Sequence, residues 1–159
     1  KKQVISRRFS FTSPGFSNRI TELEAALGVA GLENLESDIE IRKSNAAHLT
    51  ACLQSVSNHI QLPSIRSGSD HSFMMYPLVM RNESKRELVE KLEFAGVETR
   101  DMLPLTNQKY LQDELGITEA EFPVAQWINE SGFYIGCHQD LTIAELDHAA
   151  DIICEFFAN

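Results

Sequence analysis

The chain has 159 residues, of which 43% are hydrophobic and 23% are charged, and this is the size and composition of one globular domain or of one domain with an appendage. At this length about 70% of the unfolded surface can be buried, so a core can form without metal or disulfide staples. The formal net charge of −9 argues against a surface for nucleic acid or anionic membrane, because such surfaces bind through clustered Lys and Arg.

The cysteines and the N-terminus indicate the cellular setting. Three cysteines, at scattered positions, are too few for a disulfide framework or a CxxC metal site. No apolar run reaches the roughly 20 residues that span a bilayer, and no signal-peptide stretch opens the chain. We therefore expect a cytoplasmic protein. The sequence opens on a polar, basic segment without an initiator Met, so we also expect it to be part of a longer protein.

The first part of the chain predicts two helices. An irregular segment over residues 1–16 contains the Ser13-Pro14-Gly15 turn. A helix is then expected to begin near Ser17 or Asn18, which are both good N-cap residues. Its small residues predict close contact with another backbone; they are Ala25, Ala26, Gly28 and Gly31. A second, long helix is predicted by apolar spacings of three and four from Leu35 to Val56.

Strands alternate with helices in the rest of the chain. Strands are expected over residues 60–62, 73–80, 97–100 and 133–135, helices over 84–95, 122–131 and 142–156, and a loop with a short helix over 106–115. Pro77 indicates an edge strand or a bulge, and Thr142 with Glu145 forms a capping box. Ile143 is placed on the buried face of the last helix. The alternation predicts an α/β or α+β layer fold with helices on one face of a sheet.

Few residues suggest chemistry on their own. Cys137, His138 and Asp140 could be nucleophile, base and orienter, but neighbours in an extended segment point to opposite faces, so we do not assign them. His48 and Cys52 are four residues apart on a helix and could share a metal ion. With no second ligand pair nearby in the sequence, we interpret them as an exposed His and a half-buried Cys, and we expect no metal. Asp147, His148 and Asp151 are interpreted as a solvated face of the last helix.

The turn at residues 14–19 runs into a predicted helix N-terminus. Free backbone N–H groups and the helix dipole make such a place suitable for an anion, and Asn18 and Arg19 add donors. An ordinary N-cap with a surface Arg explains the same residues. The pattern alone leaves both interpretations open.

Five segments together resemble a known family. They are Gly15-x-x-Asn18-Arg19-x-x-Glu22-x-x-Ala25-Ala26-x-Gly28, Arg42-x-x-Asn45-Ala46, the stretch HSFMMYP at 71–77, Gly96-Val97-Glu98-Thr99-Arg100 with Pro104-Leu105, and Gly136-Cys137-His138-x-x-Leu141-Thr142. Their order and spacing resemble the C-terminal part of the sugar-nucleotide aminotransferases called the DegT/DnrJ/StrS family, across nearly the whole chain.

The resemblance implies a fold-type-I enzyme that uses pyridoxal 5′-phosphate (PLP). Such an enzyme moves an amino group, usually from glutamate, onto a nucleotide-linked keto-sugar while the cofactor forms a Schiff base with a lysine. In the family that lysine lies in a large domain upstream, so we expect no catalytic residue here and no activity from this chain alone. Asn18 matches an asparagine that reaches across a dimer interface to the cofactor phosphate of the neighbouring subunit. The resemblance therefore also implies a homodimer.

Substrate contacts are implied at four further positions. Arg19 matches the arginine of the same motif, near the active site. The family often has a histidine after its Pro-Leu pair, where this chain has Thr106-Asn107-Gln108. Asn107, Gln108 and Arg100 are then candidates for lining the sugar-nucleotide site. A surface loop or a structural hydrogen bond would explain each of them equally well.

The resemblance also implies a division of the chain. Residues 1–35 would be the tail of the large PLP domain and a connecting helix, and 36–159 the small C-terminal domain, a short, mostly antiparallel sheet covered by helices. Two alternatives stay open. One is a pyridoxal- or pyridoxamine-phosphate-dependent sugar dehydratase of the same family, in which histidine replaces the Schiff-base lysine. The other is a non-catalytic ligand-binding or interaction module.

Overall fold

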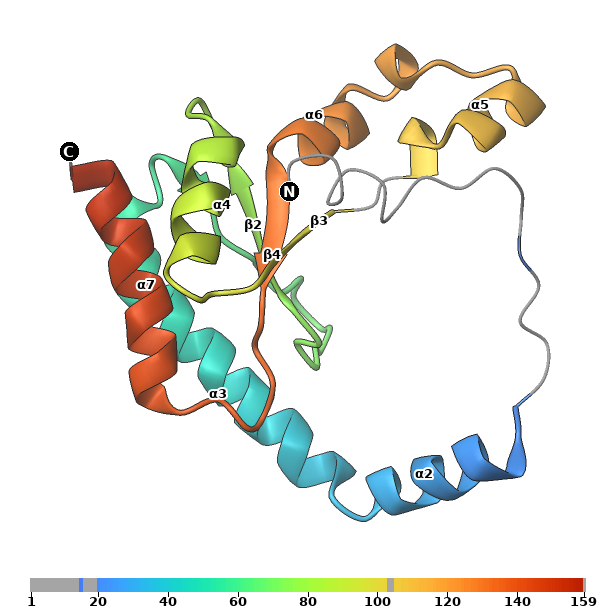
Figure 1. The fold of residues 1–159 in the computed structure, drawn as a ribbon, viewed down its shortest axis with the longest axis vertical. Coiled ribbons are helices and arrows are strands. Elements are labelled where there is room, and N and C mark those ends of the chain that lie inside the picture. Colours follow the sequence, from blue (N-terminus) through green and yellow to red (C-terminus); the bar gives the residue numbers. More distant parts are fainter. Residues whose placement is uncertain (1–14, 16–19, 103–104, 159) are drawn as a thin grey trace.

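The computed structural model describes residue 15, residues 20–102 and residues 105–158. These residues form an α+β fold in which helices cover one face of a small antiparallel sheet (Figure 1). The helices are α2 (Glu22–Leu32), α3 (Leu35–Leu53), α4 (Lys85–Phe94), α5 (Lys109–Leu115), α6 (Pro123–Ser131) and α7 (Ile143–Ala158). The strands are β1 (Ile60–Gln61), β2 (Tyr76–Met80), β3 (Thr99–Asp101) and β4 (Gly132–Ile135). The predicted fold class, with a long helix ahead of an antiparallel sheet, is confirmed.

The sheet has the strand order β1-β2-β4-β3, and all three pairings are antiparallel. The last strand in the sequence therefore lies between β2 and β3. Ile135 is opposite Tyr76 on one side and opposite Thr99 on the other. Since side chains alternate along a strand, this register puts Tyr76, Leu78, Phe133 and Ile135 on one face, where each is at most 2% exposed.

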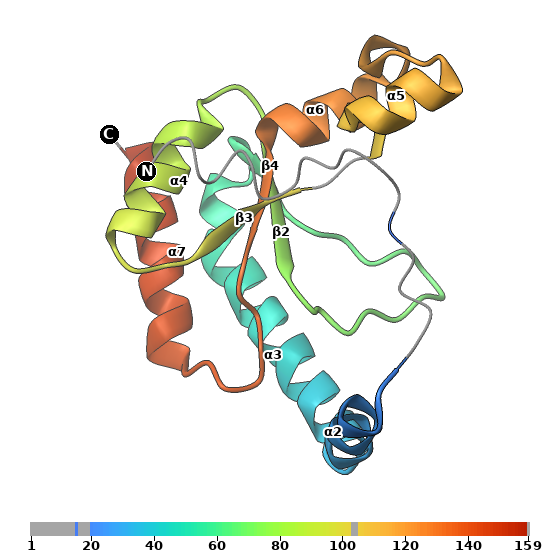
Figure 2. The same cartoon turned by 45° about the vertical axis from the view of Figure 1, so that its right-hand side comes forward.

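Three helices cover that face and complete the core: α3, α4 and α7 (Figures 1 and 2). Each contributes apolar residues at spacings of three or four, which place them along one side of a helix. They are Ala46, Leu49 and Leu53 from α3, Leu88 and Leu92 from α4, and Leu146, Ala150 and Ile153 from α7. Burial of each Leu or Ile contributes about 1.5–3 kcal/mol. This layer is the main source of stability.

The start of α7 confirms one prediction and corrects another. The Glu145 amide donates to Thr142 Oγ1 at 3.3 Å, and the Thr142 amide donates to Glu145 Oε2 at 2.8 Å, which is the predicted capping box. Ile143, predicted to be buried, is 53% exposed. It is the first residue of α7, and the helix reaches the core only at Leu146, 2% exposed.

Within the described residues, the opposite face of the sheet is covered at one end, by α6. There the Trp127 indole N–H donates to the Met80 carbonyl at 3.1 Å, which fixes α6 against β2. Helix α6 passes directly into β4 at Gly132, where an added Cβ would lie 2.4 Å from the Ile128 carbonyl oxygen. Only glycine allows the strand to begin so close to the helix.

Strand β2 is shorter than predicted, and its proline lies in an edge-like position. Phe73 has a left-handed backbone with φ of 48°, so regular strand geometry begins only at Tyr76. By strand order β2 is an interior strand, but β1 pairs only with Val79 and Met80. Among the described strands, β4 is therefore the single neighbour at Pro77, and a missing amide hydrogen is tolerated there.

Helix α2 begins later than predicted. Its N-cap is Thr21, whose hydroxyl accepts from the Glu24 amide at 3.3 Å, while Glu24 Oε2 accepts from the Thr21 amide at 2.7 Å. The predicted start near Ser17 or Asn18 is corrected to Glu22. The sequence signal for this start is Thr21-x-x-Glu24, whose two side chains form a capping box.

Helix α2 also lies apart from the core, at the far end of α3 (Figures 1 and 2). None of its residues is buried, and its larger apolar side chains are 65–73% exposed: Leu23, Leu27, Val29 and Leu32. A Cβ added at Gly28 or Gly31 would meet no described atom within 4 Å. The predicted close helix contact is therefore not made within the described part of the chain. Among the described residues, no helix combines the length and apolar character needed to cross a bilayer.

Candidate functional site

A cavity of about 330 Å³ lies beside the outer strand β3, between the sheet and the first turns of α7. Its walls come from the turn before β3, from β3 and β4, and from the segment that leads from β4 into α7. The residues with polar side chains that line it are Glu98, Arg100, Tyr134, His138, Glu145 and His148. The cavity thus joins residues from two of the five segments of the family resemblance, Gly96–Arg100 and Gly136–Thr142.

Arg100 supplies the cationic group of this cavity. It lies at the middle of β3 opposite Tyr134, on the face of the sheet that the core helices do not cover. Its guanidinium donates to Glu98 Oε1 at 2.6 Å, and both side chains are exposed, by 41% and 67%. An exposed pair of this kind contributes about 0–1 kcal/mol. An anionic ligand could therefore displace Glu98 at little cost, and guanidinium binds phosphate well.

The wall opposite Arg100 is the segment from Gly136 to Leu141, which is fixed by α3. The Asn45 side-chain amide donates to the His138 carbonyl at 2.9 Å, and Arg42 Nε donates to Gln139 Oε1 at 3.0 Å. Asn45 is only 5% exposed. The His138 ring is thereby held at the cavity, where its Nδ1 accepts from the Asp140 amide at 3.3 Å.

Cys137 points away from the cavity and into the core. It is 0% exposed, and its thiol donates to the Arg42 carbonyl at 3.5 Å. Burial raises the pKa of this thiol to about 11. A thiol that stays protonated and faces α3 cannot act with His138 and Asp140 as a nucleophile and base.

Asn107 and Gln108 belong to a different place, a chain of side-chain amides between the 3₁₀ turn η2 (Leu105–Asn107) and α6. The Gln108 amide donates to Asn107 Oδ1 at 2.5 Å, and the Asn107 amide donates to Asn129 Oδ1 at 2.6 Å. Asn129 in turn donates to Glu119 Oε1 at 3.0 Å. These bonds hold η2 against α6. The structure brings Asn107 and Gln108 together, but not into the cavity of Arg100.

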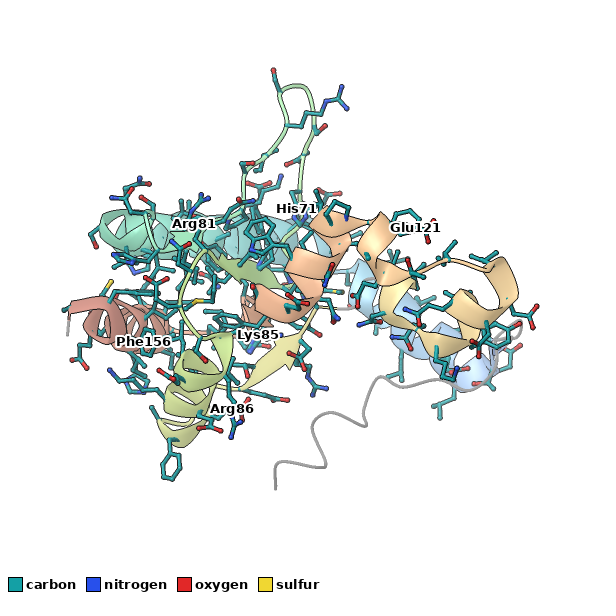
Figure 3. All side chains as sticks on the ribbon, turned by 90° about the horizontal axis from the view of Figure 1, so that it is seen from above. His71, Arg81, Lys85, Arg86, Glu121 and Phe156 are labelled. Atoms are coloured by element: carbon teal, nitrogen blue, oxygen red, sulfur yellow. The ribbon has the colours of Figure 1, made fainter. Side chains whose placement is uncertain are left out.

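Lys85, which was not predicted as a site residue, connects this amide chain to the sheet. Its Nζ donates to Asp101 Oδ1 at 3.0 Å and to the carbonyls of Asn129 and Gly132 at 2.9 and 3.2 Å. The side chain is 18% exposed and lies between α4 and the sheet (Figure 3). Lys85 thus joins the start of α4, the end of β3 and the end of α6. A lysine at a helix N-terminus gives no sequence signal for such a role.

The other described lysines also have carboxylate partners. Lys43 pairs with Glu40 and Asp70, Lys91 with Glu155, and Lys109 with Asp113. Of the predicted site residues, Asn18 and Arg19 lie outside the described residues, as do Lys1 and Lys2. The described part of the chain therefore offers a cavity with one guanidinium, that of Arg100, and a structural amide network at Asn107 and Gln108, without an unpaired lysine.

Comparisons with known proteins agree with the geometry of the fold. The sequence model of the DegT/DnrJ/EryC1/StrS aminotransferase family matches residues 1–154. The lipopolysaccharide biosynthesis protein RfbH of Salmonella typhimurium is 30% identical over 160 residues, which is 98% of this chain and 37% of RfbH. The chain thus spans little more than a third of that relative.

Two solved structures have the same fold. One is a GDP-4-keto-6-deoxymannose-3-dehydratase with a trapped PLP-glutamate geminal diamine, with a TM-score of 0.72 and 22% identity over 91% of this chain and 38% of that one. The other is PseC of Helicobacter pylori, an aminotransferase of pseudaminic acid biosynthesis, with a TM-score of 0.75 and 18% identity over 92% of this chain and 40% of that one. At these identities the likeness establishes the fold.

Proposed function

The chain belongs to the DegT/DnrJ/EryC1/StrS aminotransferase family, and from this membership we propose that it is the C-terminal part of a PLP-dependent enzyme acting on a nucleotide-linked keto-sugar. The proposed reaction is transfer of an amino group from glutamate to that sugar. The observation that carries the proposal is the match over residues 1–154 together with 30% identity to a lipopolysaccharide biosynthesis protein. A role in building a sugar of a surface polysaccharide follows from the same relative.

The described residues do not fit PLP attachment, which requires an unpaired lysine. Each described lysine is paired with a carboxylate, and Lys85 also donates to two backbone carbonyls. We therefore derive no catalytic step from this chain. Its part in the proposed enzyme is to bind and orient, while PLP attachment belongs to another part of the protein. The dehydratase trapped with PLP and glutamate supports the choice of cofactor and amino donor.

The proposed division of the chain is supported by the contrast between α2 and the rest. In the part of the chain that the structure describes, the buried core falls entirely within residues 36–159, the proposed small domain, whereas α2 within residues 1–35 contributes nothing to it. A helix with four large apolar side chains at least 65% exposed is typical of a surface that is covered in the complete protein. We propose that α2 connects this domain to the PLP domain of a homodimer. In that homodimer Asn18 would contact the cofactor phosphate of the neighbouring subunit.

For the substrate, we propose that Arg100 binds a phosphate of the nucleotide. Its exposed guanidinium stands at the cavity, and its ion-pair partner among the described residues is Glu98. Arg19 is proposed as a second cationic contact. Asn107 and Gln108 are proposed to face the sugar, in which case their mutual hydrogen bond would keep both amides in a fixed orientation.

A dehydratase of the same family is the second candidate, because a GDP-4-keto-6-deoxymannose-3-dehydratase shares the fold. Both candidates are tested by expressing the complete reading frame that encodes this chain and supplying PLP, glutamate and GDP-4-keto-6-deoxymannose. A product in which the keto oxygen is replaced by an amino group supports the aminotransferase. A product that has lost the 3-hydroxyl supports the dehydratase. A complete protein that takes up no PLP refutes both and favours a non-catalytic binding module.

A further inference from the structure

Three potential metal ligands meet at the α3–α7 interface, and none of them lines the cavity of Arg100. His48 and Cys52 lie one turn apart on α3, and Asp147 comes from α7. The His48 Nε2 and Asp147 Oδ1 atoms are 2.6 Å apart. The Cys52 Sγ lies 3.6 Å from that same nitrogen and 3.9 Å from that same oxygen. Three different donor atoms therefore converge on one point.

We propose that His48, Cys52 and Asp147 bind a divalent transition-metal ion, preferentially Zn²⁺, which joins α7 to α3. Imidazole, thiolate and carboxylate are the ligands that zinc takes in proteins, and three protein ligands with a water in the fourth position is a common arrangement. The thiolate disfavours Mg²⁺ and Ca²⁺, which prefer oxygen. From the sequence no metal was expected at His48 and Cys52, because no second ligand pair stands near them in the chain; Asp147 is 95 residues from Cys52 and was assigned to a solvated face.

The distances between the donor atoms suit a tetrahedral ion. Ordinary zinc–ligand bond lengths place the ligand atoms of a tetrahedron roughly 3.3–3.6 Å apart. The two distances from the Cys52 sulfur, 3.6 and 3.9 Å, are close to this range already. The His48–Asp147 pair, at 2.6 Å, is a direct hydrogen bond that must open by less than 1 Å. Asp147 is half-exposed on the surface of α7, so a small rotation of its side chain achieves this.

The charge around the cluster also favours a cation. Burial, and then the negative charge of Asp147, raise the pKa of the Cys52 thiol, with further contributions from Cys154 and Asp151. Among the ion pairs of the described residues, none joins Asp147 to Lys or Arg, and His48 is its partner. A divalent ion would supply the missing positive charge, and on binding it would release the thiol proton to solvent.

The test is zinc and cobalt binding to the complete protein, under reducing conditions, with matched variants. Wild-type protein should bind one more equivalent of Zn²⁺ than Cys52→Ser. Asp147→Asn should lower the zinc affinity of that site by more than the roughly 10–100-fold that loss of an outer-shell partner costs. Cys154→Ser and His148→Gln alter residues outside the ligand set and should bind like wild type. Zinc bound elsewhere in the protein contributes equally to all variants, so the difference in stoichiometry between them reports this site alone.

Cobalt reports the sulfur ligand directly. Co²⁺ should give a sulfur-to-metal charge-transfer absorption with wild type and Cys154→Ser, and not with Cys52→Ser. Mg²⁺ should not compete. Equal zinc stoichiometry in wild type and Cys52→Ser, or a Co²⁺ complex without that absorption, would overturn the proposal. Should Cys52→Ser fail to fold, His48→Gln and Asp147→Asn, which alter partly exposed side chains, decide the question by the same zinc stoichiometry.

Discussion

Gly132→Ala is expected to destabilise the protein strongly, because β4 starts against the end of α6. The new Cβ would lie 2.4 Å from the Ile128 carbonyl oxygen and 2.9 Å from Met102 Cγ. A carbon and a carbonyl oxygen normally approach only to about 3.3–3.6 Å, so α6 and β4 must separate by about 1 Å. Met102 can move aside, whereas the Ile128 oxygen belongs to the helix backbone.

The cost follows from what this separation breaks. Overpacking of a tight site costs about 1–3 kcal/mol, and the Gly132 amide also loses its bond to the Ile128 carbonyl, worth about 1 kcal/mol. The Lys85 contact to the Gly132 carbonyl, at 3.2 Å, is stretched as well. We therefore expect a loss of about 3 kcal/mol in the free energy of unfolding.

Gly136→Ala is the matched control, four residues further along. There an added Cβ would meet its nearest neighbours, in His138 and Leu141, at 3.7 and 3.8 Å, which is ordinary contact. This substitution should leave stability unchanged or raise it by up to about 1 kcal/mol, because the unfolded chain loses entropy. Urea unfolding of the complete protein gives the global change, and amide hydrogen exchange over residues 123–135 gives the local one. If both variants unfold at the same urea concentration and exchange alike, the close approach at Gly132 does not constrain the fold.

Three further predictions concern the site and the pH dependence. Arg100→Gln should raise the KM for the nucleotide sugar roughly 10–100-fold with little change in kcat, since a charge-assisted bond is worth about 1.5–3 kcal/mol. Glu98→Gln should not raise this KM. A larger increase in KM for Glu98→Gln than for Arg100→Gln would refute the role of Arg100. Asn18→Ala should weaken PLP retention by about 1–3 kcal/mol, measured by cofactor release on dilution, and unchanged retention would contradict the proposed phosphate contact. In the folded state the Cys137 thiol has a pKa of about 11, so between pH 9 and 11 it ionises mainly in the unfolded state. The free energy of unfolding should therefore fall by up to about 2–3 kcal/mol as the pH rises through this range. Cys137→Ala should remove that part of the slope in urea midpoints measured across this range.

The core helices could be predicted from sequence because their signals are local. The spacing of Leu88 and Leu92, and the pairing of Thr142 with Glu145, depend on residues one turn apart, and the structure confirms both. The prediction for the start of α2 was wrong because several possible N-cap residues stand close together in the sequence. The reciprocal hydrogen bonds of Thr21 and Glu24 select Thr21 as the N-cap.

The site depends on contacts that are distant in the sequence, and these could not be predicted. Arg100 was identified as a candidate through the family resemblance, but its cavity is completed by His138 and by the start of α7. Lys85 acts through partners 16, 44 and 47 residues away. Asp147 reaches Cys52 across 95 residues, and no periodicity in the sequence reports that α3 and α7 lie side by side.

The position of β4 in the sheet has a consequence for biosynthesis. Strands β2 and β3 are made first but do not pair with each other, since β4 lies between them. The ribosome must therefore release residues 132–135 before either strand obtains its central partner, and α7 must follow to cover the core. Until then the apolar side chains of α3, α4 and β2 cannot be fully buried. Nascent chains with such exposed apolar surface aggregate readily and are bound by chaperones. Folding of this domain should be a late, nearly all-or-none event in its synthesis.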